Sequence, residues 1–161
     1  MLAVGSGDLE ILRTVLRLAQ FDINARDERG RTALAHAVMS GKGGDIMEVI
    51  LEVEAVDVHC FDEQGVTLLM HACSQGELRM VDRLLEVGLG ANINAMDMKG
   101  RTALFHAAEK SWPDPADIVS ALLKIEGINC LLQDVTGRTP LMVATEKWHR
   151  KTAELLRQAA G

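Results

Sequence analysis

The chain has 161 residues, a formal net charge of −6 and a hydrophobic content of 48%. This length allows one domain with a sizeable core, and the apolar content excludes a chain that is disordered by composition. No stretch approaches the roughly 20 apolar residues of a membrane span, so we expect no direct membrane insertion. The first residues lack a basic segment followed by a long apolar one, so we expect no signal peptide.

The acidic surplus lies mainly in residues 27–96. It disfavours nucleic acid, whose phosphates need a basic surface, and favours a protein partner with a basic segment. The alternative is that these charges only keep the chain soluble. The three cysteines, Cys60, Cys73 and Cys130, form no Cys-x-x-Cys pair, which argues against a disulfide framework or a zinc site. We therefore expect a reducing location, cytoplasmic or nuclear.

The pattern Asp-x-x-Gly-x-Thr-x-Leu occurs four times. The copies begin at Asp27, Asp62, Asp97 and Asp134, at steps of 35, 35 and 37 residues. A fixed period of this size is typical of a repeat solenoid, in which each unit stacks on its neighbours.

Residues 62–96 show what one unit should contain. Asp62 to Gly65 predicts a tight turn, and Thr67 lies where a helix N-cap belongs. A short helix should follow over 68–75 and end at Gly76 in left-handed geometry. The spacing of Leu78, Val81, Leu84 and Leu85 predicts a second helix over 77–87, and residues 91–94 should run extended into the next turn.

The sequence thus predicts one all-α domain, residues 1–161, of about four and a half repeats, each a helix-turn-helix with a hairpin-like turn. The expected units are a partial N-terminal repeat (1–26), repeats 27–61 and 62–96, repeat 97–133 with a loop insertion, and a C-terminal capping repeat (134–161). The partial first unit indicates either an N-terminal cap or a fragment of a longer protein.

Four aligned hexapeptides identify the family that the chain resembles. They are Thr32-Ala-Leu-Ala-His-Ala37, Thr67-Leu-Leu-Met-His-Ala72, Thr102-Ala-Leu-Phe-His-Ala107 and Thr139-Pro-Leu-Met-Val-Ala144. They resemble the signature Thr-Pro-Leu-His-x-Ala of ankyrin repeats, and the resemblance covers essentially the whole chain. Three histidines lie one place later than in the signature, so the hydrogen bond between repeats made by the family's histidine is not carried over.

The resemblance implies a monomeric protein–protein interaction module, an adaptor or scaffold, with no enzymatic activity and no cofactor. Two alternatives remain open: a steric inhibitor of a partner enzyme, and a targeting module excised from a larger multidomain enzyme or effector. In this family the partner surface is formed by the turn tips and the inner side of the short helices. The expected tip residues are Glu28, Arg29, Arg31, Glu63, Gln64, Val66, Met98, Lys99 and Arg101. The expected helix residues are His36, Met39, Ser40, His71, Ser74, Gln75, His106, Glu109 and Lys110, with Trp112 in the inserted loop as a further contact or as a cover for the second helices.

No catalytic or metal-binding constellation is predicted. His36, His71 and His106 recur on successive repeats about 8–10 Å apart, which gives a ladder rather than a metal cage. They should serve packing or partner contact. Arg31, Arg101 and Arg138 follow the turn glycines, where local pairing and partner contact both remain open. Asn24 resembles the asparagine that hydroxylases modify in some ankyrin proteins, but a loop-fixing role is favoured.

Overall fold

The computed structural model describes residues 9–18, 22–41, 43–110 and 113–161. Regular structure in these segments is helical, apart from one isolated antiparallel bridge between Phe61 and Thr67. No helix within them is both long and apolar enough to cross a bilayer. The expectation of an all-α solenoid is confirmed.

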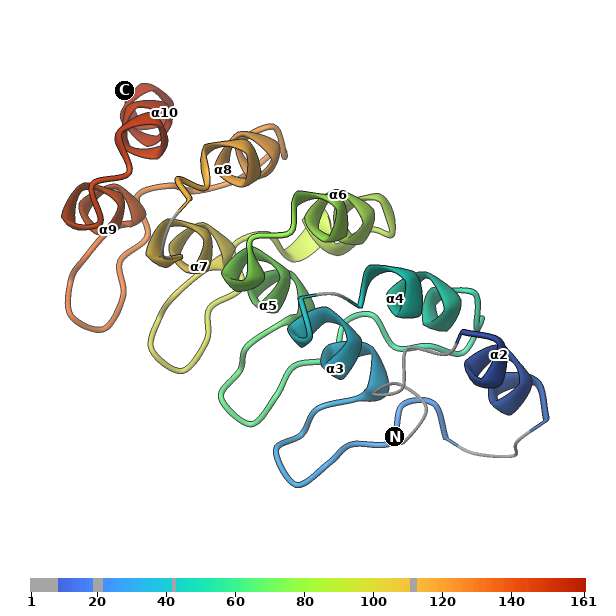
Figure 1. Cartoon of the computed structure of the whole chain (residues 1–161). Helices are drawn as coiled ribbons and strands as arrows, with labels where there is room; N and C mark the ends of the chain where they lie inside the picture. The colour runs from blue at the N-terminus through green and yellow to red at the C-terminus, as the bar shows by residue number, and fades with distance from the viewer. Residues whose placement is uncertain (1–8, 19–21, 42, 111–112) are drawn as a thin grey trace.

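The helices form two parallel rows (Figure 1). The inner row contains α3 (Ala33–Met39), α5 (Leu68–Gln75), α7 (Ala103–Glu109) and α9 (Pro140–Glu146). The outer row contains α2 (Leu9–Leu18), α4 (Gly44–Leu51), α6 (Leu78–Glu86), α8 (Ala116–Leu123) and α10 (Arg150–Ala160). Hairpin-like turns project from the inner row on one side of the molecule.

Threonine N-caps begin the inner helices, and a left-handed glycine ends α5. Thr32, Thr67 and Thr139 accept the amide N–H of the third helical residue, which satisfies one of the free donors at each N-terminus. Thr102 holds the same position without this bond, and its buried hydroxyl has no partner among the described residues. Gly76 ends α5 at φ 79°, a left-handed conformation that costs glycine little.

A column of small residues lets the helices stack closely. Ala37, Ala72, Ala107 and Ala144 are fully buried at equivalent positions of the inner row. Each inner helix packs on the next, and α6, α8 and α10 pack in sequence in the outer row. Between α4 and α6 a cleft of about 230 Å³ opens, and an ion pair at 2.9 Å from Arg83 to Glu48 bridges these two helices.

One local prediction is wrong. Residues 91–94 do not run extended, because the 3-10 helix η1 (Leu89–Asn92) and a following turn bury Leu89 and Ile93 against the core. Asp114, in the loop before α8, caps α10 of the next repeat. Its carboxylate accepts the amide of Lys151 at 3.0 Å and the hydroxyl of Thr152 at 2.6 Å.

Asn24 fixes a loop, as favoured from the sequence. Its Nδ2 donates to the carbonyl of Ala55 at 2.7 Å, and its Oδ1 accepts the amide of Asp57 at 2.7 Å. Asn94 makes the same pair of bonds to Gly127 and Asn129 two repeats later along the solenoid.

Candidate functional site

The turn tips are joined into a ladder by backbone hydrogen bonds. The amides of Glu63, Met98 and Val135 donate to carbonyls of the preceding turn, at 3.1, 2.9 and 2.9 Å. The turns approach closely because glycine carries no side chain. A Cβ on Gly30 would lie 3.1 Å from the Glu63 amide nitrogen. The tips therefore present a continuous, ordered edge.

Each turn is organised around its aspartate. In repeat 97–133, Oδ1 of Asp97 accepts the amides of Lys99 and Arg101 at 2.8 and 2.9 Å. Its Oδ2 accepts Nε of Arg101 at 2.9 Å and lies 3.1 Å from Nε2 of His106. Asp27 has the equivalent bonds with Arg31 and His36, and Asp134 those with Arg138. The arginines and histidines therefore serve local pairing, and each histidine bonds within its own repeat.

These contacts shift several pKa values. The side chain and backbone amide of Arg31 hold the pKa of Asp27 below its usual range. Burial alone would raise the pKa of Asp97, but hydrogen bonds from Arg101, Lys99 and His106 outweigh it and lower that pKa. Burial lowers the pKa of His71 and of His106 despite their aspartate neighbours, which favours neutral imidazoles.

A groove of about 520 Å³ lies on the inner side of the solenoid, across three repeats. Nine of the residues expected to contact a partner line it: Arg29, Arg31, Met39, Glu63, Gln64, Val66, His71, Ser74 and His106. The tenth lining residue is Asp62, which was expected only to form the turn. Val66 and His106 are largely buried, whereas Glu63 and Gln64 are exposed.

The remaining expected contact residues lie outside this groove. Glu28, Ser40, Met98 and Lys99 are exposed. Met98 is apolar, whereas the aligned tip residues of the two preceding repeats are Glu28 and Glu63. Arg101 and Glu109 bind each other at 2.8 Å beside Asp97. His36, Gln75 and Lys110 are half-buried. Trp112 lies outside the described residues.

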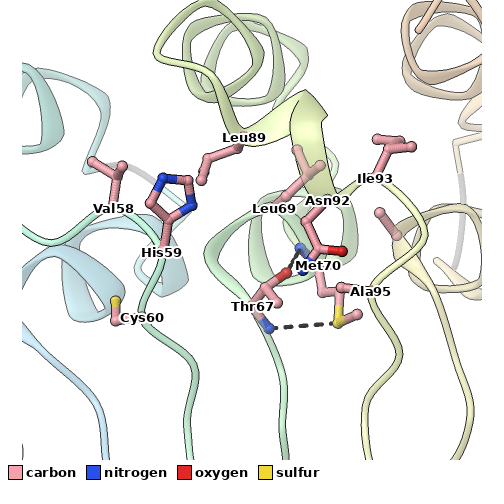
Figure 2. A pocket seen from close by; sticks show the side chains of 11 residues that line it. Val58, His59, Cys60, Thr67, Leu69, Met70, Leu89, Asn92, Ile93 and Ala95 are labelled. Atoms are coloured by element: carbon pink, nitrogen blue, oxygen red, sulfur yellow. Dashed lines mark hydrogen bonds between the residues drawn. The ribbon is translucent and has the colours of Figure 1, made fainter. Parts of the chain in front are cut away.

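A second hollow is part of the core. It measures about 60 Å³ and lies between the loop at 58–60, helix α5 and the chain around η1 (Figure 2). It is far smaller than the several hundred Å³ of ordinary ligand sites. Cys60 lines it, with Sγ 3.4 Å from Oγ1 of Thr32, and burial raises the pKa of this thiol. Burial also raises the pKa of Cys73, so neither thiol is activated as a nucleophile.

Among the described ranges, no group of three or more His, Cys, Asp or Glu side chains is arranged to hold a metal ion. The three histidines His36, His71 and His106 each face the aspartate of their own turn.

Trp148 is an exposed side chain that was not predicted from the sequence. Trp148 is 84% exposed and has φ 62°, the single positive φ of a non-glycine residue in the described segments. It follows α9, where its amide donates to Thr145 and the His149 amide donates to Ala144. This is the bond pattern of a helix end that usually contains glycine. Gly41 and Gly76 occupy the position of Trp148 in two earlier repeats, and this alignment could have predicted the left-handed conformation.

Comparison with protein-family models adds to this geometry. A model described as ankyrin repeats (3 copies) matches residues 1–97 and 86–161. The chain belongs to the ankyrin-repeat family. A search of curated proteins found no match. Ankyrin repeats are generally protein–protein interaction modules, and ankyrin-repeat proteins are typically non-enzymatic.

Proposed function

We propose that this ankyrin-repeat protein is an adaptor or scaffold that binds a partner protein through its inner face. The inner face comprises the turn tips and the exposed sides of α3, α5 and α7. The observation that carries the proposal is the groove, because three successive repeats contribute to it and nine of the residues expected from the sequence line it. The proposal also places the protein in a reducing compartment, since Cys60, Cys73 and Cys130 are all free and buried.

The groove suits a protein segment better than a small metabolite. It is open, spans several repeats and combines the thioether of Met39 with the polar groups of Gln64 and Ser74. Adaptable methionine and amide side chains are common in protein-binding surfaces. The backbone ladder between tips means that little conformational entropy is lost when a partner binds.

Affinity capture with matched variants tests the proposal. Met39→Ala and Gln64→Ala remove side chains that line the groove and leave the turn bonds intact. Asp82→Ala is the control, because Asp82 is exposed on the outer helix α6. Partners are captured from a cell extract, identified by mass spectrometry and then bound quantitatively to each purified variant.

We expect at least one inner-face change to weaken a captured partner fivefold or more, since a few residues dominate an interface. The Asp82 variant should bind like the original chain. Equal binding by both inner-face variants, combined with loss in the Asp82 variant, would refute the proposal. Thermal melts followed by circular dichroism serve as the control that all three variants remain folded.

A further inference from the structure

Repeat 62–96 lacks one member of the turn network. The other three repeats carry an arginine four residues after the turn aspartate, and its Nη2 lies 2.7, 2.8 and 2.9 Å from Oδ2 of that aspartate. The aligned residue in this repeat is Val66. Its side chain is apolar and cannot pair with the carboxylate of Asp62.

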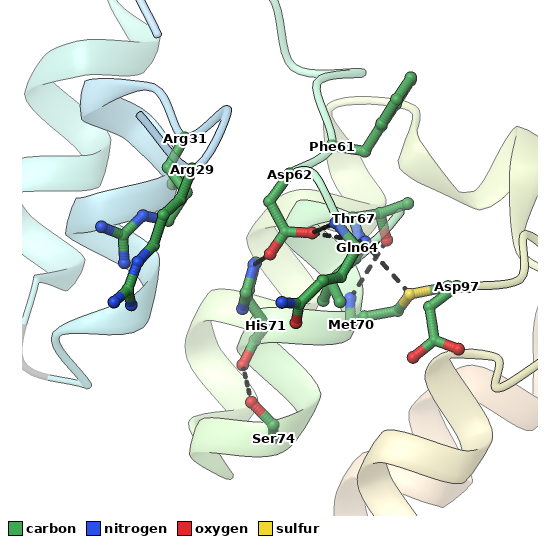
Figure 3. Close-up of polar contacts among 12 residues, drawn as sticks. Arg29, Arg31, Phe61, Asp62, Gln64, Thr67, Met70, His71, Ser74 and Asp97 are labelled. Carbon is green, nitrogen blue, oxygen red and sulfur yellow. Dashed lines mark hydrogen bonds and ion pairs between the residues drawn. The ribbon is translucent and has the colours of Figure 1, made fainter. Parts of the chain in front are cut away.

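Asp62 nevertheless keeps its other contacts. Its Oδ1 accepts the amides of Gln64 and Val66 at 2.9 Å each, so the turn itself is intact. Its Oδ2 lies 3.2 Å from Nε2 of His71 (Figure 3). Within the described part of the chain, no arginine or lysine makes an ion pair with Asp62, whose side chain is 12% exposed.

The groove occupies the space that an arginine fills in the next repeat. There the guanidinium of Arg101 lies between Asp97 and Glu109, 2.8 Å from each. In repeat 62–96 the position of Glu109 is taken by Ser74. Asp62, Val66, His71 and Ser74 all line the groove, so the carboxylate, the ring and the hydroxyl border open space.

Charge in the groove favours a cation. Arg31 lines one side, but its guanidinium is already bound to Asp27 at 2.7 Å. The remaining charged lining residues are Arg29, Asp62 and Glu63. Because Asp27 neutralises Arg31 from outside the groove, two carboxylates and one guanidinium remain without that compensation among the lining residues. A half-buried carboxylate without a cation is an unfavourable arrangement that an incoming cation would relieve.

We propose that this groove is a socket for an arginine side chain of the partner protein, whose guanidinium takes the place beside Asp62 that Arg101 takes beside Asp97. The inference rests on the proposed function and specifies the chemistry of the partner. Arginine fits better than lysine because its planar fork can donate to the Asp62 carboxylate and the Ser74 hydroxyl together.

The socket is tested directly with a monovalent probe. Acetyl-arginine-amide is titrated into the ¹⁵N-labelled full chain, and acetyl-lysine-amide is the matched control. Amide shifts at Val66, His71 and Ser74 should saturate in the millimolar range, as one ion pair allows. The lysine probe should bind several-fold more weakly.

Three variants locate the effect. Val66→Arg should abolish probe binding, because its own guanidinium then fills the socket. Asp62→Asn should also abolish it, since the amide keeps the Oδ1 acceptor for the turn but removes the charge. Asp82→Asn, the same change of charge on the outer helix α6, should bind the probe like the original chain.

Two results would overturn the socket: no saturable shifts at these residues, or equal binding of the arginine probe by the Val66→Arg variant. The Val66→Arg variant restores the pattern of the other repeats, so it remains informative even where Asp62→Asn fails to fold. The proposed function is judged separately. A captured partner that depends on Met39 but binds the Val66→Arg variant normally would leave the function standing and remove the socket.

Discussion

The two oxygens of each turn aspartate have separate tasks. One oxygen accepts backbone amides and closes the turn, and the other holds the arginine or histidine that follows. This division explains why Val66 can replace an arginine without opening its turn, since only the second oxygen loses a partner.

Stability should fall as the pH drops below neutrality. Burial lowers the pKa of His71 and His106, so the folded chain binds fewer protons than the unfolded chain. The stability that the two neutral histidines allow is fully present above the unfolded pKa of about 6.5. It is lost as the pH falls from there toward their lower pKa values in the folded chain. Urea denaturation between pH 7.5 and 5 should show the loss, with a limit of about 1.4 kcal/mol per pH unit for each histidine.

The variant His106→Asn should flatten that slope, because one of the two titrating groups is gone. A further loss should begin near pH 4, where the lowered pKa values of Asp27, Asp97 and Asp134 mean that only the unfolded state takes up protons readily. A stability that rises on acidification from pH 7.5 to 5 would contradict this assignment.

Trp148 should cost the protein stability. A non-glycine residue in left-handed geometry is disfavoured by roughly 1–2 kcal/mol. Trp148→Gly should therefore raise the free energy of unfolding by about 1 kcal/mol, and Trp148→Ala should gain much less because alanine keeps the strain. Denaturant titration of both variants checks this, and a destabilised glycine variant would show that the indole packs favourably.

Helices of seven or eight residues, such as α3, α7 and α8, are not stable alone. They are held by caps and by neighbours, and some caps come from another repeat. Asp114 is the clearest case, because it lies in the loop before α8 and bonds the first turn of α10. The inserted loop thus fastens the last repeat instead of only lengthening a connection.

Asp114→Ala should destabilise the C-terminal repeat by about 1 kcal/mol, the usual cost of a lost cap. Hydrogen exchange should accelerate in α10 more than in α3 or α5. Glu154→Ala, an exposed change on α10 itself, is the matched control and should stay within about 0.5 kcal/mol. Equal exchange rates for α10 in the two variants would refute the cap.

Across the whole molecule, the two rows differ in continuity. The inner row packs without interruption from α3 to α9, whereas the outer row is opened by the cleft between α4 and α6. The Arg83–Glu48 bridge there is exposed, and exposed pairs contribute little.

We therefore expect α2 and α4 to open before α6 and α8. Stability in a solenoid depends on contacts between neighbouring repeats, and the outer contacts are weakest at this cleft. Native-state hydrogen exchange in low denaturant should show lower protection in residues 44–51 than in residues 116–123. The reverse order would mean that the cleft does not weaken the coupling.

The sequence predicted what is encoded locally. The turn at Asp62, the cap at Thr67 and the left-handed end at Gly76 follow from residue chemistry within a few positions. The bond from Asp114 to α10 spans 37 residues and depends on how repeats stack, which no local pattern contains. The alignment of repeats shows that Val66 replaces the arginine of the other three copies. Only the fold shows that Ser74, at the position of Glu109, borders the groove beside Asp62.

Differential hydrogen exchange on the complex with a captured partner tests the central claim most directly. Binding through the inner face predicts slower exchange in residues 62–75, 28–39 and 97–106, with α4, α6 and α8 unchanged. Protection confined to α4, α6 and α8, with the turn tips and inner helices exchanging as in the free chain, would contradict it.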